Sequence, residues 1–303
     1  MINVALDLAR YVRSAVLNYR SQQVRRHVRG DSPGGDAQFD IDYIAEDAAV
    51  RFLQAETRCR AALYSEDRGY LAIHSDPEYL FVVDPIDGTR PAAAGLEMAM
   101  VSVAVAPHDR DAALKDVVCA VLVEVESGRA IYGDAQGLRA DGYQVDLPRL
   151  NDARDIAYMF WSIELNGHPM SLMAKAYGDL VDASANSGAV FVFNSSTFSI
   201  SRIITGQMDA YVDVGNRVLR DHPETEPDFR RAGRGSILHL FPYDIAAVVF
   251  LAQLAGVVIT DAYGGSLDET KLQDMGPMNQ QSCVAACTAE LHAALIKSIN
   301  WTF

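Results

Sequence analysis

The stretch FVVDPIDGTRP, from Phe81 to Pro91, runs from a hydrophobic segment straight into two carboxylates, a proline and a glycine. Its apolar start, 81–83, predicts a buried strand. Pro85 has a fixed φ, lacks a backbone donor and favours extended geometry at the residue before it. The proline therefore fixes a turn in which the side chains of Asp84 and Asp87 can face one point.

The residues after the second aspartate add a backbone feature. Gly88 permits close approach of the main chain, and the N–H groups of Gly88 and Thr89 can open a helix or nest that cradles a phosphate. Asp-Gly is also a common turn pair, so a capped turn without a ligand is the alternative for these residues taken alone. The favoured interpretation is a corner that holds divalent metal ions against a phosphate.

Two acidic positions far from this corner support a metal site. Glu66 and Asp67 follow a short apolar run in LYSEDRGY, and Asp244 begins the apolar segment FPYDIAAVVFLAQLAGVVITD. Asp244 alone could be a helix N-cap. Carboxylate oxygens at strand ends and at a helix start are, however, the ligands that the hard cation Mg²⁺ prefers. The three sites together predict a magnesium centre.

The composition limits the partners. The chain has 303 residues, of which 50% are hydrophobic, and a formal charge of −14. This is an ordinary globular composition, sufficient for one large domain or two smaller ones. The acidity argues against nucleic acid and against an anionic membrane. A phosphorylated substrate would have to be met by local positive charge or by bound metal.

Other catalytic constellations are weak. The seven histidines are scattered, and the segments around Ser187 and Ser195 do not form a nucleophile elbow. The segment GQMDAYVDVG contains no phosphate-binding lysine, which argues against a nucleotide-binding loop.

The cysteines and the amino terminus indicate a cytoplasmic protein. Four cysteines in a chain of this length fit a reducing compartment, and Cys283 and Cys287 have no further Cys or His at a zinc spacing. We therefore expect buried free thiols. The amino terminus carries arginines within its apolar pattern, unlike a signal peptide, and no segment approaches the length that spans a bilayer.

Periodicity in the first half predicts an α+β unit. Amphipathic helices are predicted at 2–19 and 41–57, with a Gly-, Pro- and Asp-rich loop between them. Arginines at 20, 25, 26 and 29 predict a solvated basic face at the end of the first helix. Strands are predicted at 61–64, 80–83 and 98–106, and a hairpin is predicted to join 117–125 to 130–132.

The second half predicts an α/β layer, because strands alternate with helices. The predicted strands are 156–161, 189–193, 210–214 and 257–260, and the predicted helices are 172–181, 197–205 and 244–255. We place a boundary near residue 150, which divides the chain into an N-terminal subdomain, 1–150, and a C-terminal subdomain, 151–303.

Three blocks carry a family resemblance. DPIDGT at 84–89, SED at 65–67 and PYDIAAVVFLAQLAGVVITD at 242–261 resemble the signature blocks of the inositol monophosphatase family. This family belongs to a lithium-sensitive, magnesium-dependent phosphatase superfamily with fructose-1,6-bisphosphatase and phosphoadenosine-phosphate phosphatase relatives. The likeness covers nearly the whole chain. It implies a layered α-β-α-β-α sandwich with the site between its two halves.

The resemblance also implies residue roles. Glu66, Asp84 and the carbonyl of Ile86 would bind a first Mg²⁺, while Asp84, Asp87 and Asp244 would bind a second. Glu66 would assist a weaker third ion, and Mn²⁺ would substitute for Mg²⁺.

For catalysis, the resemblance implies that Thr89 orients or deprotonates the attacking water, with Asp47 as its acidic partner. The substrate would contact Gly88, Thr89, Arg90, Asp213 and Asp244, and Asp213 would meet a substrate hydroxyl. Relatives also imply a homodimer.

The sequence departs from the family pattern at two places. RPAAAG replaces the usual residues after DPIDGT, where Arg90 is either a phosphate-binding fork or an exposed arginine. A long insertion, 216–243, precedes Asp244 and carries arginines at 217, 220, 230, 231 and 234. It is predicted as a surface loop or as a lid that recognises a second phosphate or a neighbouring subunit.

These features predict a Mg²⁺-dependent phosphomonoesterase acting on a small polyol or sugar phosphate. Inositol monophosphate leads, and fructose 1,6-bisphosphate follows closely. A phosphatase of the 3′-phosphoadenosine 5′-phosphate type is the third candidate. The alternative from another class is a catalytically silent metal- or ligand-binding relative, which the altered RPAAAG segment supports.

Overall fold

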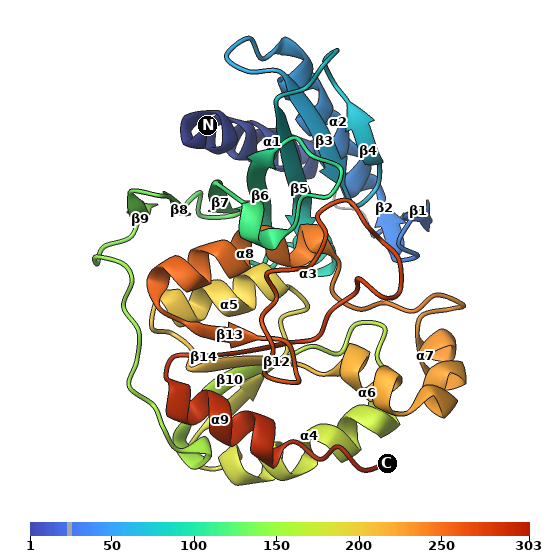
Figure 1. Cartoon of the computed structure of the whole chain (residues 1–303), viewed down its shortest axis with the longest axis vertical. Helices are drawn as coiled ribbons and strands as arrows, with labels where there is room; N and C mark the ends of the chain where they lie inside the picture. The colour runs from blue at the N-terminus through green and yellow to red at the C-terminus, as the bar shows by residue number, and fades with distance from the viewer. Residues whose placement is uncertain (23–25) are drawn as a thin grey trace.

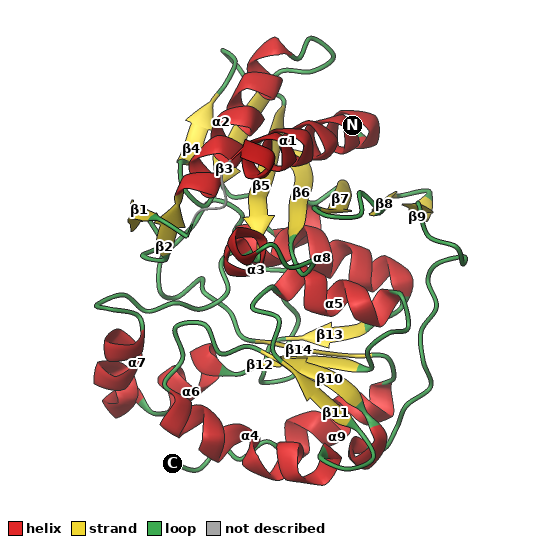
Figure 2. Cartoon of the chain, turned by 180° about the vertical axis from the view of Figure 1, so that it is seen from behind, coloured by secondary structure: helices red, strands yellow, loops and turns green. Residues whose placement is uncertain are grey.

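Sheets and helices alternate in five layers in the computed structural model, which describes residues 1–22 and 26–303 (Figures 1 and 2). The order is a helix pair, a seven-stranded sheet, a central helix pair, a five-stranded sheet and an outer helix pair. The pairs are α1 (Ile2–Gln22) with α2 (Asp40–Ala55), α5 (Ser196–Ile204) with α8 (Pro242–Ala255), and α4 (Met170–Ser184) with α9 (Ala289–Ser298). The predicted α-β-α-β-α sandwich is confirmed.

The seven-stranded sheet brings two acidic segments together. Its order is β4 (Gly69–Ala72), β3 (Ala61–Ser65), β5 (Tyr79–Asp87), β6 (Met100–Pro107), β7 (Cys119–Glu124), β8 (Ala130–Asp134) and β9 (Gly137–Asp141). Strands β3 and β5 run parallel, with Ser65 opposite Val83. Glu66, directly after β3, and Asp84, the next residue of β5, therefore lie side by side toward the carboxyl ends of these strands.

The five-stranded sheet brings a second pair of acidic residues together. Its order is β11 (Ala189–Phe191), β10 (Phe160–Ile163), β12 (Ala210–Asp213), β14 (Cys283–Ala286) and β13 (Val258–Thr260). Strands β10 and β12 are parallel, with Ile163 opposite Val212. Glu164 and Asp213, at or just after the carboxyl ends of these strands, therefore lie at one sheet edge.

The hydrophobic run that precedes Asp84 is continuous because both faces of β5 are covered. Phe81 and Val83 pack in the cluster formed with α1 and α2, whereas Leu80 and Val82 pack in the cluster that includes α5 and α8. Alternate side chains of a strand point to opposite faces, so a strand buried on both sides is apolar throughout.

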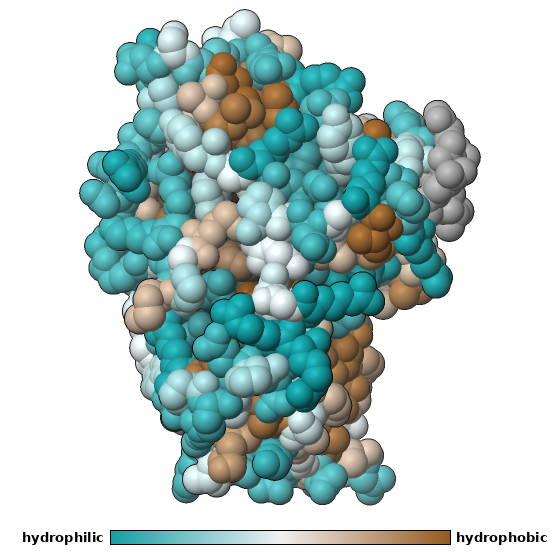
Figure 3. Space-filling model, turned by 90° about the vertical axis from the view of Figure 1, so that its right-hand side faces the viewer, coloured by the Kyte–Doolittle hydropathy of each residue, from teal (hydrophilic) through white to brown (hydrophobic). Residues whose placement is uncertain are grey.

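The surface visible in Figure 3 is mostly hydrophilic, with small hydrophobic patches.

The cysteines are buried and free, as predicted. Within residues 1–22 and 26–303, no helix combines the length and apolarity needed to cross a bilayer. Of the predicted basic face after the first helix, Arg25 lies outside the described residues, and Arg26 and Arg29 are exposed.

Most predicted elements are confirmed within a few residues, including the β7–β8 hairpin, but two predictions were wrong. The strand predicted at 156–161 begins only at Phe160, because Ile156–Tyr158 forms a 3₁₀ turn whose Ala157 amide donates to the side chain of Asp155 at 2.9 Å. The predicted loop in the insertion contains α6 (Gly215–Asp221), a 3₁₀ turn (Pro223–Thr225) and α7 (Glu226–Ala232).

Several short elements were not predicted from the sequence. The loop between α1 and α2 contains a hairpin of β1 (Val28–Asp31) and β2 (Ala37–Phe39). A six-residue helix, α3 (Thr89–Ala94), follows the metal corner, and a 3₁₀ turn (Leu114–Asp116) precedes β7. Strands β4, β9 and β14 and helix α9 complete the set. The division into subdomains near residue 150 stays a prediction, although the chain passes from one large sheet to the other there.

A buried ion pair ties the first sheet to the central helices. Arg202 of α5 donates to Glu124 of β7 at 2.7 Å, and both residues are buried. Glu124 also accepts from Arg129 at 2.8 Å and from the hydroxyl of Tyr143 at 2.8 Å. Because both charges are desolvated, removal of one leaves the other poorly compensated.

We expect Arg202→Ala to lower the free energy of unfolding by about 3 kcal/mol, the lower part of the range for breaking a buried pair, since Glu124 keeps Arg129. Chemical denaturation measures this loss. Arg154→Ala, at an arginine whose side chain is 68% exposed, is the control and should be near neutral. A loss for Arg202→Ala as small as that of the control would contradict the assignment of a stabilising role to this pair.

Candidate active site

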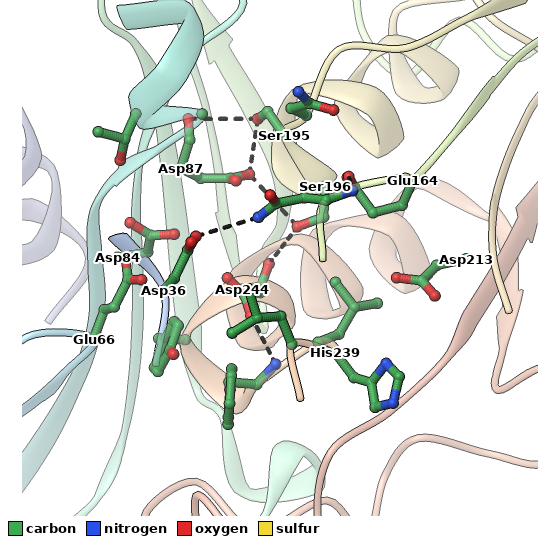
Figure 4. A pocket seen from close by; sticks show the side chains of 18 of the residues that line it. Asp36, Glu66, Asp84, Asp87, Glu164, Ser195, Ser196, Asp213, His239 and Asp244 are labelled. Carbon is green, nitrogen blue, oxygen red and sulfur yellow. Dashed lines mark hydrogen bonds between the residues drawn. The ribbon is translucent and has the colours of Figure 1, made fainter. Parts of the chain in front are cut away.

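A pocket between the two sheets collects carboxylates from distant parts of the chain (Figure 4). Glu66 and Asp84 lie on one side of it, while Glu164 and Asp213 lie on the opposite side. The acidic residues that line the pocket are Asp36, Glu66, Asp84, Asp87, Glu164, Asp213 and Asp244. All four acidic residues predicted to bind metal are therefore brought to one place.

Strand β5 contains a bulge between Asp84 and Asp87, next to Pro85. Asp84 pairs with Ser102 and Asp87 pairs with Met100, so three steps along β5 match two along β6. In a regular strand, residues three apart point to opposite faces. The extra residue reverses this parity, and both aspartates line the same pocket.

Asp87 is fixed by the start of α5. Its Oδ2 accepts from the Ser195 hydroxyl at 2.8 Å, from the Thr197 amide at 2.6 Å and from the Thr197 hydroxyl. These bonds use one carboxylate oxygen, which leaves Oδ1 for a ligand. The sequence around Ser195 does not predict a nucleophile, and it does not predict this orienting role either.

Asp244 is both a helix cap and a pocket residue. It occupies the third position of α8, and its Oδ2 accepts from the Phe241 amide at 2.7 Å. Asp84 likewise uses Oδ1 to accept from the Ile86 amide at 3.0 Å. In both residues one oxygen is held by the backbone and the other stays available.

The acidic side chains raise one another's pKa values. Burial, followed by the charges of Asp87 and Asp244, raises the pKa of Asp84 well above its ordinary value. Burial and then the charges of Asp84 and Asp244 do the same for Glu66. Like charges held together in this way favour a compensating cation.

The donor set fits a hard divalent cation. The side-chain donors predicted to bind metal are all carboxylate oxygens, which Mg²⁺ and Mn²⁺ accept. Among residues 1–22 and 26–303, no three Asp, Glu, His or Cys side chains are already arranged to enclose an ion. Mg²⁺ does not require a complete protein cage, since it keeps several waters and takes one or two carboxylates together with substrate phosphate.

The backbone beside the aspartates is suited to close approach. Gly88 has φ of +88°, and a Cβ added there would lie 2.5 Å from the Met98 carbonyl oxygen. Only glycine tolerates both conditions. Gly88 and Thr89 line the pocket next to Asp87, as the cradle interpretation requires.

The predicted acidic partner of Thr89 was wrong. The Thr89 hydroxyl lies 2.9 Å from Oδ1 of Asp42 and 3.0 Å from the carbonyl oxygen of Ile86. Asp47 faces away and pairs with Arg51 at 2.5 Å. Burial raises the pKa of Asp42 to about 8, so this carboxyl is poised to exchange a proton near neutral pH.

Arg90 lines the pocket, but its guanidinium is already engaged. Its Nη1 and Nη2 donate to the two carboxylate oxygens of Asp36 at 3.1 and 2.7 Å. This bidentate pair is the fork geometry that was predicted for a phosphate. Its charge is balanced by Asp36 before any substrate binds.

The arginines of the insertion have partners away from the pocket. Arg217 donates to the Ala262 carbonyl at 2.6 Å, Arg220 to the Met278 carbonyl at 2.8 Å and Arg230 to Glu226 at 2.7 Å. None of the described residues that line the pocket is one of these arginines. The predicted arginine lid is therefore not observed. The insertion reaches the pocket through Leu238, His239 and Leu240 instead.

The far side of the pocket contains residues that the sequence did not predict as part of the site. Glu164, Asn166 and His168 follow β10, and His239 comes from the insertion. Burial raises the pKa of Glu164 to about 7, with repulsion from Asp213 adding to the rise. Burial likewise raises the pKa of Asp213 to about 7. The only sequence signal for Glu164 was its place just after a predicted strand, and none marked His239.

Comparison with known proteins settles the family. A sequence model of the inositol monophosphatase family matches residues 1–301. The chain belongs to the inositol monophosphatase family. Over 301 residues it is 24% identical to the fructose-1,6-bisphosphatase/inositol-1-monophosphatase of Archaeoglobus fulgidus, covering 99% of this chain and 98% of the relative. Over 273 residues it is 28% identical to the protein of the same name from Methanothermobacter thermautotrophicus, covering 86% and 82%.

A further relative has another stated substrate. The bifunctional NADP phosphatase/NAD kinase of Methanococcus maripaludis is 24% identical over 280 residues, which are 87% of this chain but 44% of that protein. The family and these relatives are phosphatases, so this family member is a hydrolase of phosphate monoesters.

Solved structures share the fold. An inositol monophosphatase from Anabaena aligns with a TM-score of 0.66 at 15% identity, covering 98% of this chain and 94% of that one. A crystal structure described as an inositol monophosphatase–fructose 1,6-bisphosphatase gives a TM-score of 0.70 at 18% identity, covering 98% of both chains.

We expect Asp42→Asn to lower kcat for phosphate release by about 100-fold, the lower end of the range for loss of a general base. Asp47→Asn, the matched control five residues away, should stay near wild type because Asp47 contacts Arg51 rather than Thr89. Steady-state phosphate release measures both variants. The reverse order of effects would restore Asp47 as the partner of Thr89.

The raised pKa of Glu164 makes stability depend on pH. Its pKa is 4.5 ordinarily and about 7 in the fold, so its contribution to stability is complete below about pH 4.5 and is lost as the pH rises through 7. Glu164→Gln, which stays neutral, should be more stable than wild type by on the order of 3 kcal/mol at about pH 8, but not at about pH 4.

Urea denaturation at both pH values, in the presence of a chelator, measures this difference. Glu224→Gln, at a residue whose side chain is 71% exposed, is the control and should show no such pH dependence. A Glu164→Gln effect that is the same at both pH values would contradict the assignment.

Proposed function

We propose that this protein is a Mg²⁺-dependent phosphomonoesterase that hydrolyses a small polyol or sugar phosphate. Inositol monophosphate is the leading substrate, followed by fructose 1,6-bisphosphate, which the names of the archaeal relatives support. The observation that carries the proposal is the convergence of Glu66, Asp84, Asp87 and Asp244 on one pocket beside Gly88.

The residues that would hold the ions are those predicted from the sequence. Glu66, Asp84 and the carbonyl of Ile86 would form one site, while Asp84, Asp87 and Asp244 would form another. When bound, divalent cations supply neutralisation of the phosphate dianion, acidification of the attacking water and stabilisation of the leaving alkoxide. Mn²⁺ is proposed to substitute for Mg²⁺.

The chain contributes orientation and proton transfer. The Thr89 hydroxyl is held between Asp42 and the Ile86 carbonyl, 2.9 and 3.0 Å away. We assign Thr89 to orient the attacking water and pass its proton to Asp42, whose pKa of about 8 suits this task. The N–H groups of Gly88 and Thr89 would bind phosphate oxygens, which fixes the ester for attack.

A nucleotide phosphatase is the second candidate, since one relative is named as an NADP phosphatase. A catalytically silent relative is less well supported, because the carboxylates and Thr89 are all present. Lithium sensitivity, a homodimer and a cytoplasmic location remain proposals that follow from the resemblance and the composition.

Metal binding tests the proposal without relying on turnover. Calorimetric titration of Mg²⁺ and Mn²⁺ into the full chain should give saturable binding, which Asp84→Asn weakens by at least about tenfold, because loss of a ligand should cost no less than loss of an outer partner. Asp76→Asn, at a side chain that is 91% exposed, is the matched control and should bind as wild type.

Phosphate release in the same preparations should stop with a chelator and return with Mg²⁺. Metal binding without release of phosphate from any monoester would favour the silent relative. No binding of either ion would remove the basis of the proposed function.

A further inference from the structure

We propose that Glu46 is a positioning residue for the metal site, because it fixes the turn that carries Glu66 through a hydrogen bond on either side of that residue. This inference rests on the proposed function, since it requires Glu66 to bind metal. Glu46 lies outside DPIDGT and the other two blocks that carry the family resemblance, and it is not one of the described residues that line the pocket.

Glu66 differs from the other three acidic side chains proposed as metal ligands. The carboxylates of Asp84, Asp87 and Asp244 each accept a backbone amide, at 3.0, 2.6 and 2.7 Å. Within the described parts of the chain, the side chain of Glu66 makes no hydrogen bond. Both of its oxygens are therefore available to ions, but the position of this carboxylate depends on how its main chain is held.

The main chain of Glu66 lies in a tight turn at the edge of the seven-stranded sheet. Strands β3 and β4 are antiparallel, with Ser65 opposite Gly69, so residues 66–68 form the turn of a hairpin. Strand β4 ends the sheet, and no strand of this sheet lies beyond it. Contacts from outside the sheet must therefore fix the turn.

Glu46 of α2 supplies such contacts on both sides of Glu66. Its Oε2 accepts from the hydroxyl of Ser65 at 2.8 Å, and its Oε1 accepts from the amide of Asp67 at 3.1 Å. Glu46 is 1% exposed and Ser65 is 0% exposed, so water does not replace the contact between them. The two bonds hold the chain before and after Glu66 against the same buried carboxylate.

Helix α2 thereby positions two parts of the site. Asp42 and Glu46 are four residues apart, and residues at this spacing share one face of a helix. Asp42 lies 2.9 Å from the Thr89 hydroxyl, whereas Glu46 holds the turn of Glu66. One rigid helix thus fixes the group assigned to orient the water and a group assigned to bind metal.

A carboxylate near a cation site also attracts the cation by charge alone, and the two effects are separable. Glutamine has nearly the shape of glutamate without its charge. Its amide oxygen can accept from the Asp67 amide, and its NH₂ group can donate to the oxygen of Ser65. Glu46→Gln therefore keeps both contacts, whereas Glu46→Leu removes both.

The test is calorimetric titration of Mg²⁺ and Mn²⁺ into the full chain and its variants. Glu46→Leu should weaken the affinity by at least about tenfold, the lower end of the range for loss of a residue that orients a metal ligand. Glu46→Gln should bind close to wild type. Circular dichroism and urea denaturation in the presence of a chelator show whether each variant is folded.

Glu56→Leu is the matched control, because it makes the same change at another buried glutamate, directly after α2. Glu56 is 8% exposed and accepts from the amides of Thr57 and Arg58 at 2.8 and 2.7 Å, outside the pocket. This variant should lose stability in urea but bind both ions as wild type. The comparison separates an effect on metal affinity from a general loss of stability.

If Glu46→Leu does not fold, Ser65→Ala decides. It removes one of the two contacts and should weaken the affinity by about fivefold, the size of one hydrogen bond. An unchanged affinity in Ser65→Ala would then overturn the inference.

Three further results would overturn the inference and leave the proposed function intact. The first is an unchanged affinity in Glu46→Leu. The second is an equal loss in Glu46→Gln, which would assign the effect to charge. The third is an equal loss in Glu56→Leu, which would assign it to general destabilisation. No binding of either ion by the wild type would overturn the proposed function, and the role of Glu46 with it.

Discussion

Mutual repulsion among carboxylates in one pocket is the constraint on which the rest of this structure depends. Asp84, Asp87 and Asp244 each have a pKa raised first by burial, and the charges of Asp87 and Asp244 add to the rise at Asp84. Folding does not favour such an arrangement by itself. The fold holds it through fixed contacts: a bulge in β5, the start of α5 on Asp87 and the start of α8 on Asp244. The hydrogen bonds from α5 and α8 each occupy one carboxylate oxygen, of Asp87 and of Asp244, and leave the other oxygen available.

The two sides of the pocket differ in their charged groups. On the side of β3 and β5, a divalent cation held by the acidic side chains would supply the positive charge that attracts a phosphate dianion. On the side of β10 and β12, Glu164 and Asp213 share the pocket wall with His168 and His239, whose pKa values burial lowers.

The sequence correctly predicted that Asp84 and Asp87 lie together, which depends on adjacent residues, but it predicted the wrong neighbour for Thr89, which depends on the rotation of a helix. Pro85 restricts the backbone of DPIDGT locally and Gly88 permits a tight turn, so a turn that brings Asp84 and Asp87 together could be predicted without the fold. Asp42 and Asp47 lie five residues apart on α2, so they point in different directions around a helix of 3.6 residues per turn. Only the packing of α2 against the sheet places Asp42, rather than Asp47, beside Thr89. The predicted arginine lid was wrong for a related reason. Composition shows that the insertion is rich in arginine, but it does not show which residues those arginines contact.

The sequence by itself determined most helices and strands and the glycine turn, since these depend on periodicity and on neighbours within a few residues. Its resemblance to the family added the layered fold and the four acidic residues proposed as metal ligands. The tertiary structure alone decided the partner of Thr89, the pairing of Arg90 with Asp36 and the meeting of His168 with His239. The members of each of these pairs come from segments that carry no shared motif. Their distance is set by the crossing of strands and helices, which local residue patterns do not specify.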